Sequence, residues 1–192
     1  MNELEKSIQA YFGVVKHEEL SVISSLFKAE HLKKGDFYLK SGLQCNKLSF
    51  VKSGLVRIYS QSENKEVTQW ISDKSSFITD LSSWVFGKPS RWTMQALTDV
   101  TFFTIYKSDY QQLEEKVRDW HKLEKMFIAK CFAVMEDRIF SHLSMTAEDR
   151  YQFFYENNRE LFNQVPLQYI ASLLGMTPET FSRIRKKQLS RV

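Results

Sequence analysis

The chain has 192 residues, of which 43% are hydrophobic and 26% are charged, and its formal net charge is +4 at pH 7. This composition is typical of a globular protein with one large or two small domains, and the modest charge permits nucleic-acid binding without requiring it. No apolar stretch approaches the ~20 residues that span a bilayer, and the polar start MNELEKSIQA is unlike a secretory signal. We therefore expect a cytoplasmic protein with no membrane partner.

Residue patterns that carry common catalytic chemistry are sparse. Cys45 and Cys131 lie far apart in the sequence, which favours reduced thiols over a disulfide framework or a zinc site. The four histidines show neither HxH nor HExxH spacing, so we expect no metal and no barrel enzyme of the cupin type. The sequence also has no glycine-rich phosphate loop and no GxSxG turn. We expect a protein that is not an enzyme.

The first half of the chain changes from helix to strand. Apolar spacing predicts helices over residues 3–12 and 17–27, and short segments rich in β-branched and aromatic residues follow from Ala29 to Tyr106. In KLSFVKSGLVRIYS, Ser53-Gly54 predicts the turn of a hairpin. Further strands are predicted over residues 67–71, 91–97 and 100–106. This regular spacing predicts a jelly-roll-like barrel, in which strand edges are hidden.

Beyond the barrel the pattern is helical. We predict a short helix over residues 109–117 and a long one from about 119 to 143. Two apolar rows lie on adjacent faces of the long helix. One row is close to a coiled-coil seam and is the predicted interface of a twofold dimer: Trp120, Leu123, Phe127, Cys131 and Val134. The other row is left to cover the barrel: Ile128, Phe132, Met135, Ile139 and Leu143. The alternative is a helix buried on both faces within one subunit.

The segment VPLQYIASLLGMTPETFSRIRKK, residues 165–187, predicts two short helices joined by a tight turn. Pro166 suits the first turn of a helix, Gly175 suits a left-handed helix end, and Thr177 suits the cap of a helix that starts at Pro178. Phe181 and Ile184 would face the first helix. A preceding helix is predicted to begin at the capping pair Thr146 and Asp149. This pattern is typical of a helix-turn-helix domain.

The second helix of this motif would present a polar and cationic face to DNA. Such a helix enters the major groove with its N-terminal residues at the base edges. Arg183 has the fork geometry that reads guanine, and Glu179 can accept from a cytosine amino group. The predicted DNA-binding residues are Thr177, Glu179, Thr180, Ser182, Arg183, Lys186 and Lys187, with Arg185 and Arg191 as further phosphate contacts. The alternative is a solvated basic terminus on two ordinary amphipathic helices.

The order of barrel, long helix and helix-turn-helix resembles the CRP/FNR family of bacterial transcription regulators. The segment IASLLGMTPETFSRIRKK is similar to the family's DNA-reading pattern, with Glu179 and Arg183 at the base-contacting positions. The resemblance implies an α+β chain with a cyclic-nucleotide-binding-like jelly-roll barrel and flanking helices over residues 1–118. It further implies a long dimerisation helix over residues 119–145 and a helix-turn-helix domain over residues 146–192. The implied partners are double-stranded DNA, a second copy of the chain and RNA polymerase.

The resemblance also implies an effector pocket between the barrel and the long helix, where members that bind cyclic nucleotides carry Gly-Glu and Arg-Ser pairs. Here Thr79-Asp80 replaces Gly-Glu and Ser90-Arg91 inverts Arg-Ser, while Met135 and Glu136 stand where adenine-contacting members carry hydroxyls. These six are the candidate ligand-binding residues. The alternative is that Asp80 is a helix cap or turn residue and Arg91 is solvated. The pocket residues do not support a cyclic nucleotide as cofactor, so the expected effector is an unknown small molecule.

The prediction from the sequence is a dimeric, sequence-specific DNA-binding transcription regulator whose effector pocket departs from the cyclic AMP pattern. The alternative is a signalling module that binds a cyclic nucleotide or another small molecule and whose helical tail contacts protein rather than DNA. Pro178 motivates this alternative, because it occupies a position where many relatives carry a DNA-contacting side chain.

Overall fold

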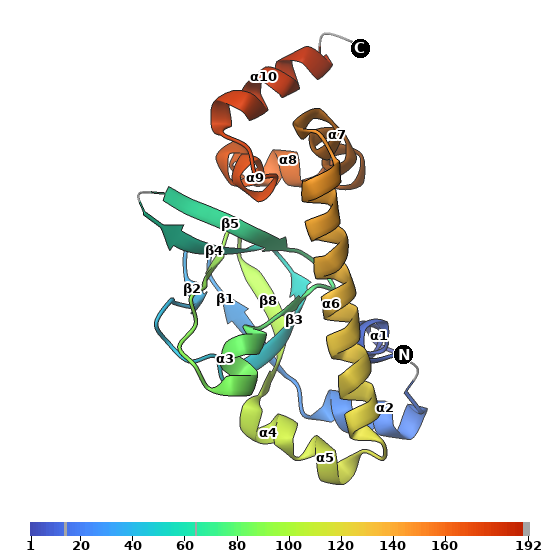
Figure 1. The fold of residues 1–192 in the computed structure, drawn as a ribbon. Coiled ribbons are helices and arrows are strands. Elements are labelled where there is room, and N and C mark those ends of the chain that lie inside the picture. The colour runs from blue at the N-terminus through green and yellow to red at the C-terminus, as the bar shows by residue number, and fades with distance from the viewer. Residues whose placement is uncertain (14, 64, 190–192) are drawn as a thin grey trace.

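The strands form a jelly roll. The computed structural model describes residues 1–13, 15–63 and 65–189, with the backbone alone for Leu189. Among these residues the strands make two antiparallel sheets, ordered β1-β8-β3-β6 and β2-β7-β4-β5 (Figure 1). The strands are β1 (Lys28–Leu32), β2 (Phe37–Leu39), β3 (Lys47–Ser53), β4 (Val56–Ser62), β5 (Lys65–Ser72), β6 (Phe77–Ile78), β7 (Thr93–Ala96) and β8 (Val100–Tyr106). The predicted α+β class with a jelly-roll barrel is confirmed.

Strand β3 is buried on both faces, so its residues from Leu48 to Val51 are all buried. Leu48 and Phe50 pack in a cluster with Ile8 and Phe127, which come from the helices outside the barrel. Val51 belongs to the second cluster, between the two sheets. A strand covered on both sides loses the usual alternation of apolar and polar residues.

The Ser53-Gly54 turn does not close a hairpin, so that prediction is wrong. Strand β3 pairs with β6 and β8, whereas β4 pairs with β5 and β7, so the turn carries the chain from one sheet to the other. Gly54 has a φ of +91°, and a Cβ at this position would collide with the carbonyl oxygen of Asp99. Turn chemistry identifies where a strand ends but not which strand it pairs with.

Helices flank the barrel, and one of them extends beyond it. α1 (Glu3–Phe12) and α2 (His17–Ser25) precede the barrel, and α3 (Leu81–Phe86) lies between β6 and β7. α4 (Lys107–Gln111) and α5 (Leu113–Lys116) replace the single short helix that was predicted. The long helix α6 (Trp120–Ser144) runs along the barrel and leads to the C-terminal domain (Figure 1).

The C-terminal domain consists of α7 (Ala147–Asn157), α8 (Leu161–Gln164), α9 (Leu167–Leu173) and α10 (Pro178–Leu189). Thr146 and Asp149 form the predicted capping box at the start of α7. Gly175, in the turn between α9 and α10, has a φ of +68°, as the predicted left-handed helix end requires. The two helices and the tight turn of the predicted motif are therefore present, together with the short helix α8, which was not predicted.

Candidate functional site

Helix α10 is held by its apolar side. Phe181 and Ile184 are buried in one cluster with Ile170 of α9, and the ring of Phe181 lies 5.3 Å from that of Tyr151 of α7 between centroids. Thr177 caps the helix as predicted, because its hydroxyl accepts from the backbone N–H of Thr180 at 3.2 Å. The opposite side of α10 consequently faces solvent.

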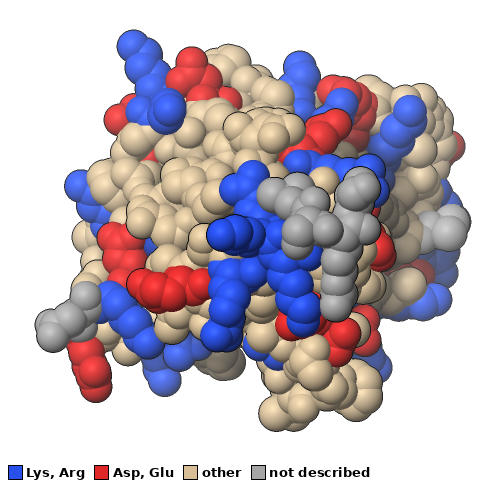
Figure 2. Space-filling model, turned by 90° about the horizontal axis from the view of Figure 1, so that it is seen from above, with Lys and Arg blue, Asp and Glu red and all other residues tan. Residues whose placement is uncertain are grey.

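The exposed side of α10 carries most of the predicted DNA-binding residues. Thr180 is half-buried, and the exposed ones are Thr177, Glu179, Ser182, Arg183, Lys186 and Lys187. Four of the five residues from 183 to 187 are cationic. Figure 2 shows Lys and Arg side chains gathered near the centre of the face that is seen from above. Lys187 also pairs with Glu148 of α7 at 2.7 Å. The predicted phosphate contact Arg191 lies outside the described residues.

Glu179 sits in the first turn of α10, where the helix dipole favours an anion. The backbone N–H of Glu179 itself and then the Thr177 hydroxyl donate to the carboxylate and lower its pKa. At neutral pH Glu179 is therefore an ionised acceptor, next to the exposed cations that begin at Arg183.

The buried and the exposed apolar rows of α6 are the reverse of those that we predicted. Trp120, Leu123 and Phe127 are buried in the subunit's own core with Ile8 and Phe12 of α1, so they do not face a second copy. Cys131 is half-buried against the same cluster, and Val134 is exposed beside a cavity. The row assigned to the barrel is exposed instead: Ile128, Phe132, Met135, Ile139 and Leu143. Both rows have helical spacing, and α1 determines which one is covered, because it packs on only one of them.

A cavity of ≈ 330 Å³ lies between β5, the start of α3 and α6. Four of the six candidate ligand-binding residues line it: Thr79, Asp80, Arg91 and Met135. Ser90 and Glu136 are not part of the described lining. Trp70, Phe77 and Trp92 give the cavity large aromatic walls. The structure therefore places most of these candidates around one mainly apolar space.

Three of the polar candidate residues, Asp80, Arg91 and Ser90, already have partners within the chain. Asp80 caps α3, because its Oδ1 accepts from the backbone N–H groups of Ser82 at 3.0 Å and Ser83 at 3.3 Å. The alternative prediction for Asp80 is thus confirmed. Arg91 is exposed and stacks on the Trp92 ring at 4.5 Å from its centroid. The Ser90 hydroxyl accepts from the N–H of Trp92 at 2.9 Å.

Ser72 is the residue of this cavity that sequence reasoning missed. Its side chain lines the cavity and is fully buried, and its Oγ has no hydrogen-bond partner among the described residues. A buried hydroxyl without a partner costs free energy. A serine at the end of a strand carries no sequence signal of this kind.

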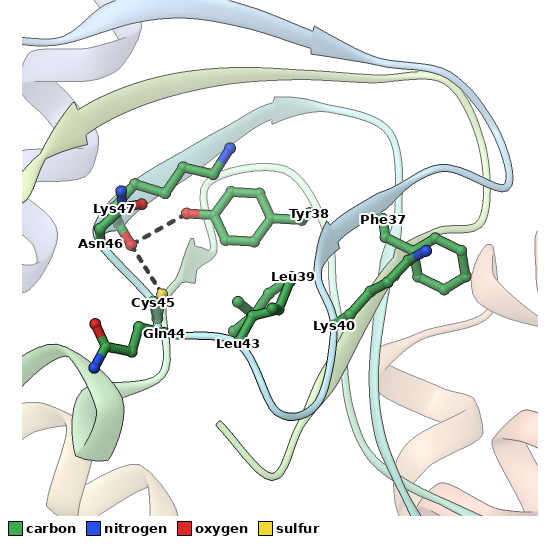
Figure 3. Close-up of a pocket in the computed structure, with 9 residues that line it drawn as sticks. All are labelled: Phe37, Tyr38, Leu39, Lys40, Leu43, Gln44, Cys45, Asn46 and Lys47. Carbon is green, nitrogen blue, oxygen red and sulfur yellow. Dashed lines mark hydrogen bonds between the residues drawn. The ribbon is translucent and has the colours of Figure 1, made fainter. Parts of the chain in front are cut away.

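A second cavity, of ≈ 390 Å³, is formed by β2 and the loop that leads to β3 (Figure 3). The Tyr38 hydroxyl bonds to the Ser49 hydroxyl at 2.9 Å and donates to the carbonyl of Lys47 at 3.3 Å. The Cys45 thiol donates to the same carbonyl at 3.3 Å. Burial raises the pKa of Tyr38 well above its usual range. These polar groups are hydrogen-bonded within the chain. The cavity at Ser72 is therefore the stronger candidate for a ligand-binding site.

The described residues contain no group of three or more His, Cys, Asp or Glu side chains placed to hold a metal ion. No described helix combines the length and the apolar character needed to cross a membrane.

Comparison with known proteins agrees with this architecture. Residues 29–116 match the family model of the cyclic nucleotide-binding domain. No curated protein sequence matches the chain. FixK2 from Bradyrhizobium japonicum is similar in structure, with a TM-score of 0.69 and 18% identity over 86% of this chain and 85% of FixK2.

Two further solved structures share the fold. A putative transcriptional regulator of the CRP/FNR family from Eubacterium rectale has a TM-score of 0.67 and 20% identity over 92% of this chain and 85% of its own. The catabolite activator protein of Thermus thermophilus has a TM-score of 0.57 and 19% identity over 94% of this chain and 87% of its own. At these identities the likeness shows a common fold.

Proposed function

We propose that this chain, which contains a cyclic nucleotide-binding domain within the fold of the CRP/FNR regulators, is a transcription regulator that reads duplex DNA in a sequence-specific way. The observation that carries the proposal is α10, whose apolar side packs on α7 and α9 while Glu179 and Arg183 are exposed. Residues 1–118 would act as the sensor, 119–145 as the connecting helix and 146–192 as the DNA-reading domain. We assign no catalytic reaction to the chain.

The side chains of α10 fit the chemistry of the major groove. Arg183 can donate in bidentate fashion to guanine O6 and N7, and the ionised Glu179 can accept from a cytosine amino group. Thr177, Thr180 and Ser182 supply short hydroxyls near the helix start, suited to a base edge or a phosphate. The cations at Lys186 and Lys187 would bind phosphates, which adds affinity and salt dependence without adding specificity.

A twofold dimer would place two such helices on one face of the duplex. The exposed row has spacings of three or four residues, close to those of a coiled-coil seam, along most of α6: Ile128, Phe132, Met135, Ile139 and Leu143. A contiguous row of exposed apolar side chains is typical of a protein–protein interface. Paired recognition helices about one helical turn apart, roughly 34 Å, would read a near-palindromic site. RNA polymerase is a further partner of the proposed regulator.

The proposed effector is a small molecule other than a cyclic nucleotide. The cavity at Ser72 contains no preformed phosphate site, because Arg91, the cation in its described lining, is exposed and stacked on Trp92. Asp80, which would have to hold a ribose hydroxyl, caps α3 instead. The aromatic walls suit a largely apolar ligand.

The test begins with selection of binding sites from a random duplex library by the purified chain. Replacing Arg183 by Ala should then weaken binding to the selected site by about 1–3 kcal/mol and relax the choice at one base pair. Replacing Lys186 by Ala should weaken all duplexes alike and reduce the salt slope by about one. Arg159→Ala, an exposed cation outside α10, is the matched control and should bind normally.

The outcome that contradicts the proposal is a library from which no sequence is enriched. Affinity for DNA should also fall steeply between low and physiological salt if several phosphates are bound. An enriched protein partner with little salt dependence would favour the alternative, a signalling module whose helical tail contacts protein.

A further inference from the structure

Strand β5 is the edge strand of its sheet, and the helix-turn-helix covers that edge. The order β2-β7-β4-β5 leaves one side of β5 without a neighbouring strand. Edge strands carry backbone groups that need other partners. Here the N–H of Thr68 donates to the Ser172 hydroxyl of α9 at 2.9 Å. The sensor sheet and the first helix of the motif are therefore joined by a hydrogen bond.

A bulge in β5 provides a second connection. Ile58 of β4 is opposite Trp70 and Tyr59 is opposite Thr68, so Gln69 is the extra residue on β5. Arg138 of α6 donates through Nη1 to the carbonyl of Gln69 and through Nη2 to the carbonyl of Leu173 of α9, the latter at 3.1 Å. One guanidinium thus links three elements at the bulge.

A buried arginine provides the third connection. Arg57 of β4 is only 2% exposed; its Nε donates to the Thr68 hydroxyl at 2.9 Å and its Nη1 to the Glu66 carboxylate at 2.6 Å. Its guanidinium lies 4.1 Å from the ring centroid of Tyr59 on β4 and 3.6 Å from that of Tyr169 on α9. Contacts with two tyrosine rings and a carboxylate partner compensate for the burial of its charge.

Apolar side chains also connect the barrel to α9 and α10. Leu55 and Ile71 of the sensor belong to the buried cluster that contains Ile170 of α9 and Phe181 and Ile184 of α10. Because α9 and α10 share this core, the contacts that hold α9 on β5 also determine where α10 points.

We propose that Arg57 and Arg138 are positioning residues, which hold α9 on the edge of β5 and thereby orient α10 for DNA. The expected effect on DNA binding rests on the proposed function, whereas the packing of α9 on β5 does not depend on it. The same strand reaches the sensor cavity, because Gln69, Trp70 and Ser72 line it. An occupant of the cavity would thus lie beside Gln69, whose carbonyl accepts from Arg138.

The test compares four full-length variants with the unmodified chain. Tyr169→Ala removes one face of the Arg57 stack and Arg138→Gln removes the double link, whereas Tyr169→Phe keeps the ring. Arg159→Ala, which loses a guanidinium over the Tyr155 ring within the DNA-reading domain itself, is the matched control. Hydrogen exchange of the Thr68 amide reports the docking directly, and amides of β3 and β8 report whether the barrel is intact.

We expect the Thr68 amide to exchange about tenfold faster or more in Tyr169→Ala and Arg138→Gln, with the amides of β3 and β8 unchanged. Affinity for the selected duplex should fall about two- to thirty-fold in the same two variants. Tyr169→Phe and Arg159→Ala should match the unmodified chain in both measurements.

Two results would overturn the inference. Unchanged exchange at Thr68 in both variants would show that these contacts do not hold α9. Faster exchange with unchanged or tighter binding to the selected duplex would show that the docking does not orient α10 for DNA. If the unmodified chain selects no duplex, the proposed function fails, and the exchange measurement alone still decides whether α9 is held on β5.

Discussion

Replacing Phe132 by Ala should weaken self-association, whereas replacing Phe127 by Ala should destabilise the subunit. Both phenylalanines lie on α6, but Phe127 is 1% exposed and Phe132 is 68% exposed. The Phe127 ring stacks on Phe12 at 4.8 Å and meets Phe77 edge-on at 5.0 Å between centroids. The two substitutions remove the same atoms from a buried and an exposed face of one helix.

The two substitutions should change the free energy of unfolding of the subunit by different amounts. Truncation of a buried phenylalanine costs about 3–5 kcal/mol, a large share of the ~5–15 kcal/mol that stabilises a domain. Truncation of an exposed side chain changes the stability of the subunit by only about 0.5 kcal/mol. If Phe132 anchors the proposed twofold interface, its loss should cost at least about 2 kcal/mol per dimer, or roughly thirtyfold in the dimer Kd.

Sedimentation velocity over a range of protein concentrations measures the dimer Kd, and urea unfolding measures stability. Unfolding must be compared at equal protein concentration, because self-association itself raises apparent stability. An unchanged dimer Kd in Phe132→Ala would refute the assignment of the exposed row as the interface. A Phe127→Ala protein as stable as the unmodified chain would refute the assignment of that residue to the core.

Three further outcomes are expected. Replacing Gly54 by Ala should lower the free energy of unfolding by about 2–4 kcal/mol, more than the same change at Gly42. Their φ values of +91° and +88° are alike, but of the two only Gly54 is crowded by neighbouring backbone. Equal urea midpoints for the two variants would contradict this. Burial raises the pKa of Glu30, but the Tyr106 hydrogen bond and the Lys47 charge outweigh it and leave the pKa lowered. Glu30→Gln should therefore lower the urea midpoint at pH 7, and the deficit should vanish as the pH falls through that lowered pKa; a midpoint difference independent of pH would count against it. Titration calorimetry with cyclic AMP, and with cyclic GMP as control, should give no heat, whereas micromolar binding would reveal a variant phosphate site in the cavity.

Local chemistry made the C-terminal motif predictable. A cap at Thr177, a proline at 178, a glycine at 175 and apolar residues at helical spacing each fix the conformation of a few neighbouring residues, and the structure contains all of these features. The capping box at Thr146 was predictable for the same reason. Such signals act within one turn of helix, so they do not depend on the rest of the chain.

Pairings between distant residues were not predictable. The sheet that β3 joins depends on the packing of Phe50 on the outer helices and of Val51 between the two sheets, and the covered row of α6 depends on where α1 packs. Four of the six candidate ligand residues line one cavity, but Asp80 caps its own helix there, and Ser90, outside the described lining, bonds to its neighbour Trp92. The unpartnered Ser72 hydroxyl becomes visible only when all surrounding residues are placed.

The covered edge of β5 bears on how the chain can be divided. A fragment that ended after α6 would expose the N–H of Thr68 and would leave the apolar side chains of Leu55 and Ile71 without their cover. An uncovered edge strand beside an apolar patch is a template for pairing with another molecule. The C-terminal domain should therefore also shield the barrel from aggregation, and a fragment that contains the barrel alone would need a charged residue at that edge to replace the shield.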